Sequence, residues 1–574
     1  MKTLLLCLAF FALKAGAKPP AYDVIVRGGT VYDGSGGKPY VGDVAFNKDR
    51  IVYVGPRAAG NAKMVIDARG KAVSPGFINM LAHPEETLLI DPRALSDLKQ
   101  GITLEVMGEM SMGPLTPKMR TQMKEQQIDI KYDIDWTTLG GYLAGLEKRG
   151  ISPNVASFVG AGTVRTNVLD QNDVVPTPVQ LAQMKSLVKT AMEEGALGLT
   201  TALIYAPHAF AKTEELIALA KESARCGGLY SVHMRSEGDK IEAALDETIR
   251  IARESGAPAE IYHLKFAGRE NWGKIDQVIK TIEAERAKGK NGVRIAANMY
   301  NYTAGATGLD ASMPPWVQEG GLDAWIARLK DPATRARVIS EMRDPRPAWE
   351  NLYLHAGTEG LLFLQFKNEK LKPLTGKTLA EIATLRGQNP EDTMIDLVIE
   401  DGSRVGVAYF LMSEENVRRQ LALPWMTFGS DEGGYAPEGV FLKSNPHPRA
   451  YGNFARLLGR YVRDEKLLPM ESAIYKLTGL AADHLSIKDR GRLKRGNFAD
   501  VVVFDPAKIQ DHATFDKPHQ LATGVEQVFV NGIHALKDGE ATRLPSGRFV
   551  RGRAWTGKPG GGCRASSAAW MWSR

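Results

Sequence analysis

Two apolar runs in the sequence each end in a histidine, and a predicted helix lies between them. Leu229–His233 and Ala259–His263 each have the composition of a buried strand that ends in an imidazole. Between them, apolar residues recur every three or four positions from Ile241 to Ala252, which predicts one amphipathic helix. A strand, helix, strand unit of this length predicts parallel strands, whose carboxyl ends open on one shared mouth. One strand-end histidine is commonly a hydrogen-bonded structural residue, but two in equivalent positions predict a catalytic pair or a shared metal ion.

The length and composition are those of a globular protein with a large core. The chain has 574 residues, of which 44% are hydrophobic and 24% are charged, which is enough for a barrel with insertions. Its formal net charge of +7 is spread along the sequence without a cluster of lysine and arginine. This distribution argues against a nucleic-acid partner.

The amino terminus has the pattern of a secretory signal. Lys2 precedes an apolar run from Leu4 to Leu13, and the small residues Ala15–Ala17 follow it. The run is too short to span a bilayer. We therefore expect residues 1–17 to be removed and the mature protein to be periplasmic or secreted, without membrane attachment.

The cysteines do not predict a disulfide framework. Of the three in the chain, Cys7 would leave with the signal, and Cys226 and Cys563 lie far apart in the sequence. We expect Cys226 to be a small buried residue. The glycine-rich tail, residues 553–574, is predicted to be disordered.

The sequence pattern at the two ends of the chain differs from the pattern in the middle. Short apolar runs bounded by glycine predict antiparallel strands in residues 18–74 and again in 485–552, so we expect one small β domain built from both termini. Residues 75–484 alternate between strand and helix patterns, which predicts an α/β fold of the (β/α)8 TIM-barrel kind. An insertion at about 303–347 breaks this alternation and is predicted to be a lid over the mouth, or a structural excursion.

Six short motifs, in order, resemble those of a known family. They are Pro75–Ile78, His233-Met-Arg-x-Glu237, His263-x-Lys265, Ser430–Asp431, His447-Pro-Arg449 and Ala499–Asp505. Together they make the chain similar to the amidohydrolase superfamily, and in particular to its D-aminoacylase (N-acyl-D-amino-acid deacylase) branch. The resemblance implies a metal-bearing (β/α)8 barrel on a β-sandwich, and hydrolysis of a linear amide bond.

The chain departs from this family at two metal-binding positions. Where the family has His-x-His on the first strand, this chain has Leu81 two residues before His83, so we expect one zinc ion per chain rather than two. His83 is then a candidate metal ligand, or a structural or substrate-contacting residue. The family's metal-binding cysteine is also absent, and ungapped matching puts Met110 in its place. Because a thioether is a poor zinc ligand, we predict that Glu109 replaces it, ahead of Glu105.

The remaining roles follow from the resemblance and from charge. Asp431 matches the family's general base and acid, which takes a proton from the metal-activated water and delivers it to the leaving amine. Arg449, Lys265 and Tyr300, followed by Tyr302, are predicted to bind a free substrate carboxylate. The prediction is deacylation of N-acyl-D-amino acids. The alternatives are a dipeptidase-like amidohydrolase and a catalytically degraded, ligand-binding barrel, which the two departures would favour.

Overall fold

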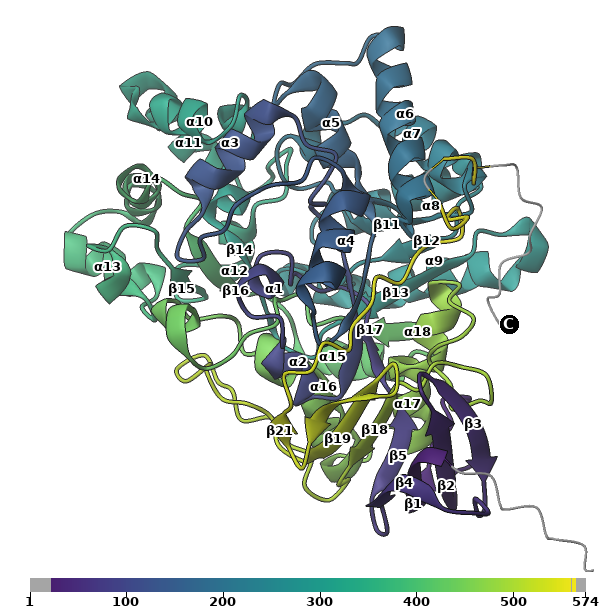
Figure 1. Ribbon diagram of the computed structural model, residues 1–574. Helices are drawn as coiled ribbons and strands as arrows, with labels where there is room; N and C mark the ends of the chain where they lie inside the picture. The colour runs from purple at the N-terminus through teal and green to yellow at the C-terminus, as the bar shows by residue number, and fades with distance from the viewer. Residues whose placement is uncertain (1–21, 559, 564–574) are drawn as a thin grey trace, which may run out of the picture.

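Parallel strands covered by helices form the centre of the molecule (Figure 1). The computed structural model describes residues 22–558 and 560–563. One parallel sheet has the order β6, β7, β8, and a second has the order β9, β10, β11, β12, β13, β17. Their bounds are Phe77–Asn79, Ile102–Met107, Asn154–Ser157, Val159–Gly160, Gly198–Ala202, Leu229–His233, Ala259–Ile261, Ile295–Met299 and Met426–Phe428. The molecule is therefore an α/β protein, as predicted.

The two parallel sheets adjoin each other at both of their edges. Only Phe158 separates β8 from β9 along the chain. At the opposite edges, the amide of Met80 donates to the carbonyl of Phe428 at 2.9 Å, and the amide of Asp431 donates to the carbonyl of Leu81 at 2.8 Å. These bonds bring β6 beside β17, although about 350 residues lie between them in the sequence.

The predicted unit around the two histidines is confirmed. Helix α8, Ile241–Ser255, joins β11 to β12, and these two strands pair in parallel. The apolar residues at spacings of three and four are the ones that α8 buries. The helix ends where Gly256 takes a φ of 77°, which a residue with a side chain rarely adopts. Strand β12 ends at Ile261, so His263 lies two residues beyond it.

Strands from both ends of the described chain pair in one nine-stranded sheet. Its purple and yellow strands lie side by side in Figure 1, where β5 pairs antiparallel with β18. The amino-terminal strands are β1 Tyr22–Val31, β2 Tyr40–Asn47, β3 Arg50–Gly55, β4 Ala62–Asp67 and β5 Ala72–Pro75. The carboxyl-terminal strands are β18 Val501–Phe504, β19 Val525–Val530, β20 Ile533–Lys537 and β21 Glu540–Ala541.

The insertion is longer than predicted, because the expected end at residue 347 was too early. Strands β14 Ala304–Gly308, β15 Leu361–Gln365 and β16 Gly406–Phe410 form a separate antiparallel sheet. Helices α10 Leu322–Lys330, α11 Pro332–Met342, α12 Leu352–Ala356, α13 Leu379–Arg386 and α14 Pro390–Asp401 share one hydrophobic cluster with it. The sequence pattern after residue 347 was wrongly assigned to the barrel because periodicity identifies a strand without identifying the sheet that it joins.

A disulfide bond joins the two cysteines that were predicted to be unpaired. Cys563 is bonded to Cys226, just after helix α7, Thr213–Arg225, and just before β11. The beginning of the tail is therefore attached to the α/β part, against the expectation of disorder from residue 553. Residues 564–574 and the predicted signal, 1–17, lie outside the described residues. Within the described ranges, no helix is long and apolar enough to cross a membrane.

Candidate active site

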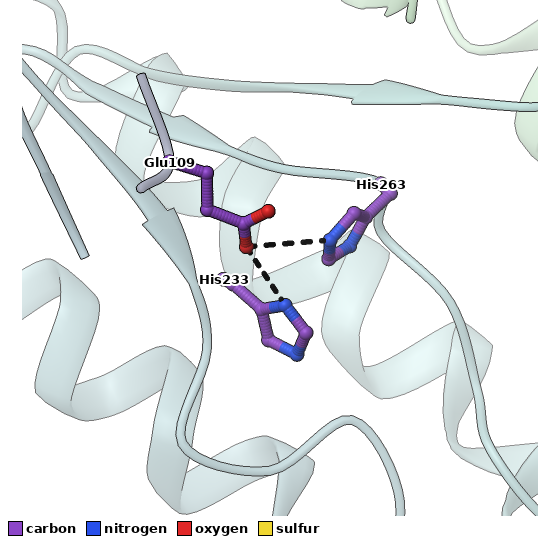
Figure 2. Close-up of side chains that lie close together, drawn as sticks. All are labelled: Glu109, His233 and His263. Atoms are coloured by element: carbon purple, nitrogen blue, oxygen red, sulfur yellow. Dashed lines mark hydrogen bonds and ion pairs between the residues drawn. The ribbon is translucent and has the colours of Figure 1, made fainter. Parts of the chain in front are cut away.

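Three side chains from three strand ends meet at one point (Figure 2). Oε1 of Glu109 lies 3.0 Å from Nδ1 of His233 and 4.0 Å from Nε2 of His263. All three residues are buried, with exposed fractions of 6%, 4% and 3%. One carboxylate oxygen and two imidazole nitrogens, all within 4.8 Å of one another, form a donor set that suits a divalent metal ion.

The backbone aims these side chains at the mouth. His233 is the last residue of β11, and Glu109 follows β7 after Gly108, whose φ is 112°. His263 has a φ of 36°, and its amide donates to Oδ1 of Asn298 at 2.9 Å. Asp431, after β17, has a φ of 55°. Positive φ values in residues other than glycine cost free energy and concentrate at functional sites.

A second group shares Glu109 with the first. Nε2 of His83 lies 3.0 Å from Oδ1 of Asp431 and 3.3 Å from Oε2 of Glu109. Leu81 is fully buried beside this group and provides only its backbone carbonyl, which accepts from the amide of Asp431. The structure thus brings together the predicted base, Asp431, and four candidate metal ligands: His83, Glu109, His233 and His263.

Paired charges keep the buried carboxylates ionised. Burial by itself would raise the pKa of Glu109, but hydrogen bonds from His233 and His83 hold that pKa well below its ordinary value. Burial would also raise the pKa of Asp431, and the positive charge of Arg449 lowers it well below the ordinary value. Both groups are therefore negative at neutral pH, as a metal ligand and a proton acceptor must be.

Glu237 belongs to the site, and sequence reasoning missed its role. Its Oε1 accepts a hydrogen bond from Nζ of Lys265 at 2.7 Å and lies 3.0 Å from Nδ1 of His263. Its Oε2 lies 3.5 Å from Nε2 of His233. Burial would raise the pKa of Glu237, but Lys265 and the histidines lower it to about 2. The signal was present, because this residue closes the motif that begins at His233.

The residues predicted to bind the substrate carboxylate differ in how close they lie to the metal-binding group. Nη1 of Arg449 is 2.8 Å from Oδ2 of Asp431, and the guanidinium is 4.3 Å from the centre of the Tyr300 ring. The Tyr300 ring centre is 6.2 Å from that of His263. Tyr302 lies farther back, with its ring against His447 and Arg456, so the structure does not bring it to the metal-binding group. Lys265 is bound to Glu237.

The other positions considered for the missing cysteine ligand lie outside the group. Met110 is 53% exposed, whereas Glu109 beside it is buried. Glu105 is fully buried, and burial, followed by the charges of Asp97 and Glu85, raises its pKa well above the ordinary value. A carboxyl in such surroundings is neutral, and a neutral carboxyl is a poor metal ligand. Of the three positions considered, Glu109 is the one that the structure places beside both histidines.

Comparison with known proteins places this geometry in a family. Residues 64–533 match the model of the amidohydrolase family, and the chain belongs to that family. It is 32% identical to a D-aminoacylase of Alcaligenes xylosoxydans xylosoxydans, over 92% of this chain and 97% of the relative.

Two solved structures are also similar to the chain. One is a D-aminoacylase described as having a binuclear metal centre, with one-metal activation and second-metal attenuation; it has a TM-score of 0.76 and 32% identity, and 92% of this chain and 99% of that one are covered. The other is the N-acyl-D-glutamate deacylase of Bordetella bronchiseptica, complexed with zinc and a phosphonate mimic of the tetrahedral intermediate. Its TM-score is 0.76 and its identity is 27%, covering 93% of this chain and 100% of that one.

Proposed function

We propose that this protein is a metal-dependent hydrolase that removes the acyl group from N-acyl-D-amino acids. The observation that carries the proposal is the convergence of Glu109, His233 and His263 on one point, in a chain related to a D-aminoacylase along nearly its whole length. The reaction breaks a linear amide bond. The Bordetella relative, with its zinc and phosphonate ligands, supports the same chemistry.

We infer that the two parallel sheets are parts of one closed (β/α)8 barrel. Counting β8 and β9 as one interrupted strand leaves eight strands in a continuous order. The bonds between the segments after β6 and around β17 support closure. A closed barrel explains why strand ends far apart in sequence face a common mouth, where barrels of this kind hold their active sites.

We further propose one zinc ion per chain, held by Glu109, His233 and His263. When bound, such an ion polarises the amide carbonyl and lowers the pKa of a coordinated water to about 7. The single-ion proposal rests on Leu81, which has no ligand atom, and on the ion pair that already engages Asp431 with Arg449. His83 then acts as a hydrogen-bonding partner of Asp431 rather than as a metal ligand.

Asp431 would move the proton. Its carboxylate is ionised and lies at the mouth beside Glu109, so it can accept a proton from the attacking water and pass it to the leaving nitrogen. The ring of His83 holds one oxygen and Arg449 holds the other, which fixes the direction of the carboxylate.

Arg449 and Tyr300 would bind the free carboxylate of the substrate. Arg449 is buried, and its Nε has no hydrogen-bond partner among the described residues, although an N–H group there is costly to leave unpaired. A substrate carboxylate provides the acceptor. Lys265 contributes positive charge to this region, while its ammonium donates a hydrogen bond to Glu237. Glu109 completes three candidate metal ligands, which removes one of the two departures that favoured the degraded-barrel alternative.

We also propose that the mature protein is exported. The bond between Cys226 and Cys563 supports this proposal, because disulfides form and persist in oxidising compartments. Fractionation of the producing cells, with the mass of the intact protein, tests it. We expect a periplasmic or secreted protein that lacks residues 1–17 and has no free thiol. A cytoplasmic protein with its leader and three free thiols would contradict export.

Metal content and amine release test the activity. We expect about one zinc per chain in the purified protein, and faster release from N-acetyl-D-amino acids than from their L enantiomers. Chelation should abolish release and added zinc should restore it. Absence of both metal and turnover would favour the ligand-binding barrel, and preferential cleavage of dipeptides would favour the dipeptidase alternative.

A further inference from the structure

Glu237 lies on the far side of both histidines from Glu109. The two imidazoles turn different nitrogens towards Glu109, Nδ1 for His233 and Nε2 for His263. Their other nitrogens face one carboxylate, with Nε2 of His233 at 3.5 Å from Oε2 of Glu237 and Nδ1 of His263 at 3.0 Å from Oε1. One buried acidic side chain therefore contacts both rings behind the candidate metal position.

This position has a chemical consequence for metal binding. An imidazole binds a metal through a nitrogen without a hydrogen, so its second nitrogen must carry the hydrogen and needs an acceptor. Each oxygen of Glu237 faces one of these two nitrogens, and a carboxylate oxygen is an acceptor. Glu237 would select the Nε2–H tautomer of His233 and the Nδ1–H tautomer of His263, which leaves free the two nitrogens that face Glu109.

Because Lys265 also contacts the His263 ring, this ring needs an acceptor that selects its Nδ1–H tautomer. Its Nζ lies 2.6 Å from Nδ1 of His263, as close as a hydrogen bond allows. If Lys265 donates there, the ring hydrogen moves to Nε2 and blocks the metal position. An ammonium has no acceptor, so Lys265 cannot receive the Nδ1–H hydrogen, and Glu237 is the neighbour that can.

The insertion holds Glu237 in place. Oε1 of Glu350 accepts from the amide of Glu237 at 3.0 Å, and its Oε2 accepts from Oγ of Ser236 at 2.6 Å. Glu350 precedes helix α12 and is itself buried. The backbone at Glu237 is thus held by a residue of the insertion, more than 100 residues away in the sequence.

We propose that Glu237 is a positioning residue that sets the tautomers of His233 and His263 for metal binding, and that Glu350 of the insertion holds it there. This inference rests on the proposed metal-dependent function, because it concerns the same histidines. It gives the insertion a role in forming the metal centre.

Metal retention distinguishes this role from a simple ion pair. Glu237→Gln and Lys265→Met both remove the ion pair between Glu237 and Lys265, so loss of that pair alone would weaken zinc binding equally in the two variants. We expect zinc affinity, measured by competition with a chelator, to fall about 10- to 100-fold in Glu237→Gln, as for other carboxylates behind metal ligands. In Lys265→Met we expect it to stay within about threefold of the unmodified protein, because both oxygens of Glu237 still face the rings as acceptors.

Glu247→Gln is the matched control. Glu247 lies in α8 and forms an ion pair with Arg235, two residues after His233, but no contact with the histidines is observed among the described residues. This variant should keep the zinc affinity. Equal losses in Glu237→Gln and Lys265→Met, or no loss in Glu237→Gln, would overturn the inference. If the unmodified protein held no zinc, the proposed function would fail instead.

A measurement on the unmodified protein remains informative if Glu237→Gln fails to fold. Nitrogen-15 NMR of the zinc-loaded protein, labelled at its 10 histidines, reports which ring nitrogen carries the hydrogen. We expect His233 to bind through Nδ1 and His263 through Nε2, with each assignment made by the signals lost in a variant of that histidine. Binding of both rings through the same nitrogen would overturn the inference.

Discussion

The two halves of the active-site mouth share Glu109 but are built differently. On the β11 and β12 side, His233 and His263 face one oxygen of Glu109 and are backed by Glu237. On the β6 and β17 side, His83 faces the other oxygen of Glu109, and its neighbours are the apolar Leu81 and the ion-paired Asp431. The first half offers ligand atoms at fixed positions, and the second offers a carboxylate in contact with a cation.

In the proposed mechanism, this difference separates the residues that hold a metal from the residue that moves a proton. A metal ligand must keep its lone pair on the ion, and Glu237 suits the first half to that task. A general base must release its proton again, and the ion pair with Arg449 keeps Asp431 ionised without tying it to a metal. The comparison therefore predicts that substitutions in the two halves have separable effects on metal content and turnover.

Removal of a metal ligand should have the largest effect. In His263→Ala, zinc content should fall towards zero and kcat/KM by about a thousandfold or more, because the site loses one of three ligands and its activated water. Elemental analysis and amine release measure both. His512→Ala is the control, because it removes an exposed imidazole bonded to Thr523 in the carboxyl-terminal part of the chain. Full metal content in His263→Ala would move the metal site to other residues.

Asp431→Asn should separate the two halves. The amide keeps the shape but cannot accept a proton, so we expect kcat to fall about 100- to 10,000-fold while zinc stays bound. Metal content and turnover should be measured on the same preparation. Loss of zinc in this variant would make Asp431 a metal ligand, and wild-type turnover would remove it from the proton-transfer step.

Arg449→Lys should have a smaller effect that depends on the substrate. Lysine keeps the charge but loses the planar fork that binds a carboxylate through two bonds, so kcat/KM for N-acyl-D-amino acids should fall about 10- to 100-fold. The matched comparison is an N-acyl amine without the carboxylate, whose slow hydrolysis should change much less. An equal loss for both substrates would mean that Arg449 acts through Asp431 alone.

The same comparison shows what the sequence could predict. His233 and His263 were identifiable because parallel strands bring their carboxyl ends together whatever the intervening chain does. Glu109 followed from the chemistry of its neighbour, since Met110 is a poor zinc ligand. The role of Glu237 did not follow, because its contact with both rings depends on the path of the loop after β11 and on Glu350 from the insertion.

Long-range contacts that leave no local pattern were missed for the same reason. Cys226 and Cys563 are 337 residues apart, and their pairing depends on where the tail crosses the α/β part. The insertion was predicted to end too early, because the β15 and β16 segments have the same strand pattern as the strands of the parallel sheets and differ only in the sheet that they join.

Leu81→His should give the smallest change in rate and tests the comparison most directly. A histidine there would add a ligand atom beside His83 and Asp431, and zinc per chain should rise from about one towards two, with turnover lowered only a few-fold as Asp431 is drawn to the second ion. Leu81→Met is the control, because it keeps an apolar side chain of similar volume. If Leu81→His still binds one zinc ion, the ion pair between Arg449 and Asp431, rather than the missing ligand at position 81, prevents a second ion from binding. Leu81→His combined with Arg449→Lys should then bind the second ion.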